Sequence, residues 1–239
     1  MVSTFLMGIK DLVVFDTLHY IVQMMSPEGF GSVGGSIYDP SLSPVRRYAR
    51  STFISLLSGL VVYQSLEAAY SIATFLAFCI PIGRRDPKRW PSLTDRPWLS
   101  TSLSDFWGRR WHQSFRQSFI HLGAKPLAYL FGRAGGVMGA FLLSEVLHDV
   151  NMWGLGRGVA WPCFFVAMGA GIVLERVWTH MTGRRVHGFT GWLWTMVWVV
   201  GWSNRLVDAW LVRGLAGKEL MPPHLRPGKY LVEKVLGVH

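Results

Sequence analysis

The sequence predicts an all-α bundle of membrane-spanning helices. Of its 239 residues, 50% are hydrophobic and only 16% are charged, whereas a soluble domain carries about 25% charged residues. Several apolar runs are long enough to cross a hydrocarbon core. In addition, 12 tryptophans and 14 phenylalanines supply aromatic side chains for the bilayer interfaces. This composition excludes disordered, fibrous and ordinary water-soluble classes. We expect about four to six spans in a single domain that covers residues 1–239.

Four apolar stretches are the candidate spans, because a charge at the bilayer centre costs roughly 2.5–3.5 kcal/mol on insertion scales. They are residues 51–83, 134–147, 158–174 and 186–204. The first stretch contains a single charged residue, Glu67, and is predicted as one long or tilted helix that ends near Pro81. A pair of short helices is the alternative. Residues 1–25 contain charges and either span the membrane or lie in its interface, and residues 29–44 are predicted as a loop.

The basic excess has a defined place in the chain. The formal net charge is +10, and the segment from Arg84 to Arg133 holds ten basic residues against three acidic ones. By the positive-inside rule this segment is cytosolic, and two further spans return Arg184 and Arg185 to the same side. Topology and anionic headgroups therefore explain the charge, so we expect the bilayer as a partner and no nucleic acid. The two cysteines lie inside apolar runs and predict neither a disulfide nor a metal site.

Residues 102–116 carry the polar pattern that most suggests a site. A helix is predicted to begin near Ser102, which with Asp105 has the form of a capping box, and Asp105 can pair with Arg109 one turn later. The helix would present a cationic face of Arg109, His112 and Arg116 beside an aromatic face of Trp107, Trp111 and Phe115. One interpretation is an interfacial amphipathic helix. The other is a set of side chains that points into a cavity and handles a phosphate-bearing cofactor.

Three short segments resemble a known family. They are Trp90-Pro91-Ser92-Leu93, then Ser102-Leu103-Ser104-Asp105-Phe106-Trp107-Gly108-Arg109-Arg110-Trp111-His112, and then Ser144 with His148-Asp149. Together they are similar to the wax synthase-like branch of the membrane-bound O-acyltransferase (MBOAT) family, and Phe106 to His112 is the most specific part. The resemblance extends from about Leu12 to Asp208. It implies the MBOAT-type helical bundle, with the interfacial helix in the cytosolic segment 84–133.

The resemblance also implies a reaction and its residues. Members of the family transfer an acyl group from a coenzyme A thioester to an alcohol, so acetyl-CoA or a longer acyl-CoA is the expected co-substrate, with no tightly bound cofactor. The acceptor is expected to be a lipophilic alcohol such as a terpenoid, and the location the endoplasmic reticulum membrane. His148 matches the catalytic base, and His112 takes a supporting role. Arg109 and Arg110, beside Trp107 and Trp111, are candidates for binding the coenzyme A phosphates, and one or both arginines are alternatively structural through Asp105.

Two departures from the family keep alternatives open. Family members usually carry glycine after the serine, where this chain has Glu145. This carboxylate either touches His148, orients the imidazole and favours its protonated form, or it blocks the tunnel. The chain is also short for the family, whose members carry additional N-terminal spans. The alternative function is therefore that of a catalytically inactive relative acting as an interaction or scaffold protein.

Overall fold

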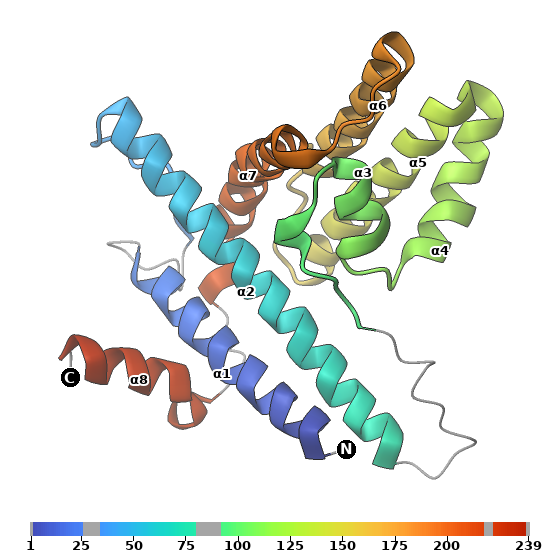
Figure 1. Ribbon diagram of the computed structural model, residues 1–239. Helices are drawn as coiled ribbons and strands as arrows, with labels where there is room; N and C mark the ends of the chain where they lie inside the picture. The colour runs from blue at the N-terminus through green and yellow to red at the C-terminus, as the bar shows by residue number, and fades with distance from the viewer. Residues whose placement is uncertain (1, 26–33, 80–91, 218–221, 238–239) are drawn as a thin grey trace. The chain divides into compact units, whose positions relative to one another are not determined.

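The computed structural model describes residues 2–25, 34–79, 92–217 and 222–237, and in these ranges it is entirely helical (Figure 1). The chain divides into two compact units, one of residues 1–93 with 210–239 and one of residues 94–209. The helices are α1 (Val2–Met24), α2 (Pro44–Cys79), α3 (Leu103–Asp105), α4 (Arg116–Ser118), α5 (Lys125–Gly154), α6 (Phe164–Thr182), α7 (Gly188–Val212) and α8 (Pro227–Leu236). The prediction of an all-α chain is confirmed.

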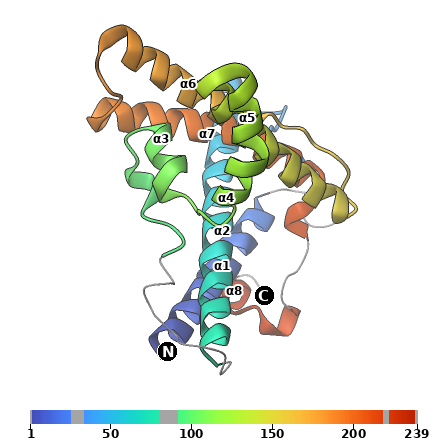
Figure 2. The same ribbon diagram turned by 90° about the vertical axis from the view of Figure 1, so that its right-hand side faces the viewer.

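The first unit is built on α1 and α2, which lie side by side (Figures 1 and 2). Helix α2 has 36 residues, or ~54 Å at 1.5 Å per residue, and is apolar enough to cross a membrane. The predicted single long helix is therefore confirmed, and it begins seven residues before Ser51. Residues 34–43 contain no helix, as predicted for a loop, while residues 29–33 of that prediction lie outside the described ranges.

A buried ion pair holds α8 against α1. Asp16 and Arg226 are each about 5% exposed or less, and the Asp16 carboxylate accepts a bond from Arg226 Nε at 2.8 Å. Its second oxygen accepts from the backbone N–H groups of Gly228 and Lys229 at 2.8 and 3.2 Å. Asp16 thus satisfies the free N–H groups at the start of α8 from a different helix. This explains how an acid is tolerated within an apolar run.

In the second unit, residues 116–154 form a hairpin rather than one rod. The stretch Arg116–Gly154 is long and apolar enough to cross a membrane, but Phe131 and Gly132 leave the helical conformation. Gly132 has φ 65° and ψ −158°, a backbone conformation that glycine adopts readily. The chain reverses there, so that a first arm (116–130) lies antiparallel to a second arm (133–154) (Figure 1).

Glycines allow the two arms to approach each other closely. A Cβ built on Gly139 would overlap the carbonyl oxygen of Gly123, and a Cβ on Gly123 would overlap the carbonyl of Gly139. The second arm contains 22 residues, ~33 Å, which is enough for one span. It contains the predicted span 134–147 and continues beyond it through His148. Within the described ranges, only α2 and the stretch 116–154 are both long enough and apolar enough to cross a membrane. The count of four to six spans therefore stays a prediction.

Helix α6 begins later than the sequence pattern indicates. The predicted span 158–174 was wrong at its first six positions, because the helix starts at Phe164 and ends at Thr182. Pro162 lies in this non-helical stretch, between Trp161 at φ 40° and Cys163 at φ 59°. Neither flanking residue can continue a right-handed helix at a positive φ. The predicted span 186–204 is helical from Gly188 onward, as α7, which continues to Val212, and that it crosses the membrane stays a prediction.

Tryptophans of α7 make contacts to α6 rather than serving only as interface anchors. Trp198 Nε1 donates to the carbonyl of Ala167 at 3.0 Å, and Trp194 Nε1 donates to Glu175 at 3.1 Å. A buried indole needs an acceptor for its N–H, and these bonds provide one. The expectation that aromatic side chains serve the bilayer interface therefore does not account for these two tryptophans.

Candidate active site

The motif segment 94–113 is anchored to α6 by a buried acid. The helix begins as predicted, with Ser102 Oγ accepting from Asp105 N at 2.9 Å. The carboxylate of Glu175, 6% exposed, then accepts from the N–H groups of Leu103 and Ser104 at 2.6 and 3.1 Å. It also accepts from Ser104 Oγ at 2.8 Å. The start of the motif is therefore fixed to α6 by several hydrogen bonds on one carboxylate.

The predicted long amphipathic helix was wrong beyond Arg110. After α3 the backbone widens into a π-helical turn, Phe106–Arg110, and Trp111 adopts an extended conformation with φ −85° and ψ 155°. The motif ends there because Asp95 N donates to Arg110 O at 2.9 Å, which ties the end of the segment to the residues that precede α3. Residues 112–116 therefore do not continue the cationic and aromatic faces that a regular helix would have formed. π-Helical turns are frequent at functional sites.

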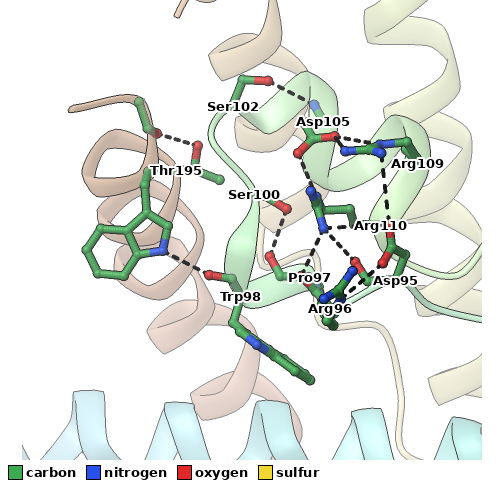
Figure 3. A network of polar contacts seen from close by, with 12 residues as sticks. Asp95, Arg96, Pro97, Trp98, Ser100, Ser102, Asp105, Arg109, Arg110 and Thr195 are labelled. Carbon is green, nitrogen blue, oxygen red and sulfur yellow. Dashed lines mark hydrogen bonds and ion pairs between the residues drawn. The ribbon is translucent and has the colours of Figure 1, made fainter. Parts of the chain in front are cut away.

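The two motif arginines bind acids of their own segment (Figure 3). Arg109 pairs with Asp105 at 2.9 Å, as predicted for positions four apart, and Arg110 pairs with the other Asp105 oxygen at 2.7 Å. Arg110 Nη1 also donates to the carbonyl of Asp95 at 3.0 Å. Burial alone would raise the pKa of Asp105, but the bonds from Arg110 and Arg109 outweigh it and hold that pKa below its ordinary value. The carboxylate is therefore charged near neutral pH.

The exposures of the two arginines differ, and this predicts different roles. The Arg110 side chain is 14% exposed and the Arg109 side chain is 61% exposed. We expect Arg110→Ala to lower stability by about 2–3 kcal/mol, because it removes charge-assisted bonds and leaves Asp105 less well paired. Arg109→Ala should cost less than about 1 kcal/mol. Thermal unfolding of the purified variants in detergent measures both, and equal losses would contradict this assignment.

Aromatic side chains continue the motif into the interior of the second unit. The Trp107 ring packs edge-on against Phe141, Phe164 and Phe165, with centroids 5.6, 6.1 and 6.0 Å away. Trp111 stacks on Phe106 at 5.6 Å. These contacts join the motif to the second arm and to the first turn of α6. Trp107 and Trp111 therefore form a wall of the site rather than an exposed aromatic face.

A cavity of about 510 Å³ lies between the motif, both arms of the hairpin and α6. Four predicted site residues line it: Trp107, Trp111, His112 and His148. Arg109 and Arg110 are not part of its lining. The two predicted histidines are 36 positions apart in the sequence, and the fold places both in the lining of this cavity. Trp90 and Pro91 of the family pattern lie outside the described residues.

The hydrogen bonding of His148 defines its tautomer. Its Nδ1 lies 2.8 Å from the carbonyl oxygen of Ser144. A carbonyl can only accept, so Nδ1 carries the proton and the lone pair of the neutral ring is on Nε2. The ring also stacks on Phe165, with centroids 4.2 Å apart. Both contacts fix the orientation of the imidazole at the cavity wall.

His112 faces the same cavity from the end of the motif. Burial lowers the pKa of His112 below its ordinary value, and charge on the nearby His148 lowers it further. The imidazole is therefore neutral at pH 7, and a neutral ring keeps one N–H donor and one acceptor. Within the described ranges no three His, Cys, Asp or Glu side chains gather as metal ligands.

Glu145 takes neither of the roles expected for it. The side chain is 1% exposed, and its oxygens accept from the N–H groups of Cys163, Phe165 and Val166 at 3.0, 2.8 and 3.4 Å. The carboxylate therefore caps the N-terminus of α6 and does not block the cavity. One turn later, Asp149 accepts from Ala160 and Trp161.

It was not predicted from the sequence that Glu145 and Glu175 cap helices. Their partners lie 18 to 72 residues away in the chain, so local spacing carries no signal for them. An indirect signal exists, because an acid in the middle of an apolar stretch requires a partner. Asp16, Glu145 and Glu175 all meet that condition, and each one binds backbone N–H groups at the start of another helix.

Comparison with known proteins gives this geometry its context. Residues 90–168, which contain the motif, the hairpin and the start of α6, match the model of the "Membrane bound O-acyl transferase family". The chain is similar to this family over about a third of its length. The resemblance inferred from the motif is thereby confirmed for these residues.

Proteins similar to this chain include acetyltransferases and long-chain-alcohol O-fatty-acyltransferases. The acetyltransferase spyB of Aspergillus fumigatus is 26% identical over 62% of this chain and 29% of its own length. The acetyltransferase aurG of Calcarisporium arbuscula is 29% identical over 64% of this chain and 40% of its own length. A long-chain-alcohol O-fatty-acyltransferase of Simmondsia chinensis is 32% identical over 35% of this chain and 27% of its own length. The chain thus spans less than half the length of these relatives. No solved structure matches it significantly.

Proposed function

We propose that this chain is a membrane-embedded O-acyltransferase that moves an acyl group from acyl-CoA to the hydroxyl of a lipophilic alcohol. The observation that carries the proposal is the convergence of His148 and His112 on one cavity. The family match over residues 90–168 supports acyl transfer as the reaction class. An apolar cavity wall of aromatic rings suits a lipophilic acceptor and excludes water that would hydrolyse the thioester.

The proposed reaction uses His148 as the general base. The alcohol gives its proton to Nε2 of His148 while its oxygen attacks the thioester carbonyl carbon. The tetrahedral oxyanion then collapses, the carbon–sulfur bond breaks, and the leaving thiolate takes the proton from the imidazolium. Nδ1 stays bonded to the Ser144 carbonyl throughout, so the ring keeps its orientation and stabilises the charged form through that bond.

His112 takes the supporting role. As a neutral ring it can donate a hydrogen bond to the thioester carbonyl and stabilise the developing oxyanion. The names of the relatives support two acyl donors, since they include acetyltransferases and long-chain-alcohol O-fatty-acyltransferases. We propose acetyl-CoA first, with a terpenoid or another specialised metabolite as acceptor, because the relatives with the longest matches are fungal acetyltransferases. The proposed location is the endoplasmic reticulum membrane.

The test is a turnover assay on membranes that contain the protein. Microsomes with and without the chain receive labelled acetyl-CoA or labelled long-chain acyl-CoA together with a panel of terpenoid and fatty alcohols. Formation of a labelled ester that depends on the chain supports the proposal. An absence of ester with every donor and acceptor, from protein that is folded and monodisperse, would favour an inactive scaffold protein.

Substitution of His112 separates its role from that of His148. We expect His112→Ala to lower kcat by about 10²-fold, the effect of removing one oxyanion donor. His112→Asn keeps an N–H donor without a titrating ring, and should retain activity within roughly tenfold of the unchanged protein.

The pH profile provides the second readout for His112. Because its pKa lies below the ordinary value, which is about 6.5, the ring charges only in more acidic solution. Activity of the unchanged protein should therefore be stable above about pH 7 and fall as the pH drops below about 6.5. His112→Asn should make this acid limb less steep, because a charged ring at position 112 would make the nearby His148 a weaker base and asparagine cannot charge. A profile of kcat from pH 5 to 8 measures this, and an unaltered limb would contradict the assignment.

A further inference from the structure

The cavity is lined by cations and by no acid in the described part of the chain. The cationic residues of the lining are Arg116, Lys125, Arg133 and Arg176. They come from both arms of the hairpin and from α6, so they converge from three helical segments. A lining with positive charge, no carboxylate and otherwise mostly apolar walls fits an amphiphilic anion rather than a neutral alcohol alone.

Three of these cations lie toward the end of the cavity away from His148. Arg133 begins the second arm, and Arg176 Nη1 donates to its carbonyl at 3.1 Å. Helix α6 runs antiparallel to this arm, because Phe165 contacts His148 near one end of the pair and Arg176 contacts Arg133 near the other. The 15 positions from Arg133 to His148 correspond to ~22 Å of helix.

Lys125 belongs to the same end of the cavity. It lies two positions after Gly123, which contacts Gly139 across the hairpin. Its Nζ is 3.3 Å from His121 Nδ1, so its position on the first arm is held by a neighbour. Lys125, Arg133 and Arg176 together are called the cationic end below.

The motif arginines are unsuited to this task. Arg109 and Arg110 share the carboxylate of Asp105, and Arg110 is also tied to Asp95. Their charge is therefore compensated within the motif, and neither lines the cavity. An incoming anion would have to displace an acid to reach them, whereas no acid lines the cavity beside the cationic end.

We propose that the cationic end binds the phosphate groups of the acyl donor. The proposal rests on the proposed function, and it assigns the donor's orientation in the cavity. Arginine forks bind phosphate oxygens through two parallel hydrogen bonds, and the lysine adds a point charge. A thioester of coenzyme A separates its phosphates from its reactive carbonyl by a long flexible arm. When the phosphates are bound at Arg133 and Arg176, the flexible part of the donor can extend along residues 133–148. The thioester carbonyl then reaches His148.

The kinetic test neutralises the cationic end and measures each substrate separately. Arg133→Gln and Arg176→Gln should each raise KM for acyl-CoA by roughly tenfold, the effect of losing bonds to a charged group. KM for the alcohol should stay within about twofold, and kcat within about threefold, because the reacting groups remain. The matched control is Arg185→Gln, which removes an exposed arginine after α6 that does not line the cavity. Equal effects on both KM values, or none, would overturn the assignment.

A binding measurement keeps the proposal testable if turnover is not found. Purified protein carrying His148→Ala is titrated with labelled acetyl-CoA, with and without Arg133→Gln and Arg176→Gln together. Loss of binding in the triple variant supports the cationic end as a donor site, whatever the turnover. Unchanged binding overturns it and leaves the proposed acyltransferase function standing. If the triple variant instead loses only co-purified anionic phospholipid and still binds acetyl-CoA, the phosphate belongs to a lipid headgroup and the proposal is wrong.

Discussion

Replacing His148 with alanine is expected to lower kcat for acyl transfer by about 10²–10⁴-fold, the usual contribution of a positioned general base. The reason is geometric. Nδ1 is committed to the Ser144 carbonyl at 2.8 Å and the ring is stacked on Phe165, so Nε2 is the nitrogen presented for proton transfer. His112 also lines the cavity, at the end of the motif segment. The measurement is initial ester formation at saturating acyl-CoA.

Two controls distinguish a chemical effect from a folding effect. His187→Ala removes an exposed imidazole outside the cavity and should leave kcat unchanged within twofold. The His148→Ala protein should still bind acyl-CoA, with a thermal midpoint near that of the unchanged chain, because the hydrogen bond to Ser144 and the stacking on Phe165 are each modest contributions to stability. Turnover of His148→Ala equal to that of His187→Ala would remove His148 from the mechanism.

The parts of the fold that follow from local rules were predictable. An uncharged run of 19 residues predicted α7, and a single acid in 33 residues predicted the unbroken α2. The cap at Ser102 and the pair of Asp105 with Arg109 follow from spacings of three and four positions. In each of these cases the interaction lies within one turn of helix, so the sequence contains all of it.

The parts that failed depend on contacts between distant segments or on backbone geometry. The bend at Phe131 and Gly132 could not be predicted without knowing that Gly123 and Gly139 contact each other across the hairpin. The late start of α6 follows from Pro162 and the positive φ angles beside it. The motif helix ended early because the backbone at Arg110 bonds to Asp95.

For the site, the sequence identified the two histidines and the two tryptophans that share the cavity. It could not show which of the two motif arginines is available to bind a ligand. That depends on how deeply each side chain is buried and on the contacts of Arg110 with Asp105 and Asp95. It also could not show what Glu145 does, since its three partners begin 18 residues later. The family pattern expects glycine at that position, and the structure shows that the carboxylate there is directed to α6.

Glu145→Ala is expected to produce the largest loss of stability, about 3–5 kcal/mol. Three backbone N–H groups at the start of α6 lose their acceptor in a buried place, and each such loss costs roughly 1–3 kcal/mol before water compensates part of it. Cys163, which precedes the helix, supplies no side-chain cap and is held at φ 59°. Strained backbone of this kind persists only while its surroundings fix it. The free energy of unfolding in mixed detergent micelles measures the effect.

Glu145→Gln provides the matched comparison and extends the prediction to catalysis. The amide keeps one acceptor oxygen at the same length, so its stability loss should be about 1–2 kcal/mol. Phe165 donates to Glu145 and its ring stacks on His148. Loosening the start of α6 should therefore lower kcat more than it raises KM for acyl-CoA, because it disturbs the base and leaves the cationic end in place. If Glu145→Gln were as unstable as Glu145→Ala, charge would be the dominant factor at the α6 N-terminus. If Glu145→Ala were as stable as the unchanged protein, the three bonds would not hold the helix, and the positioning of Phe165 against His148 would have to come from the Trp107 contacts alone.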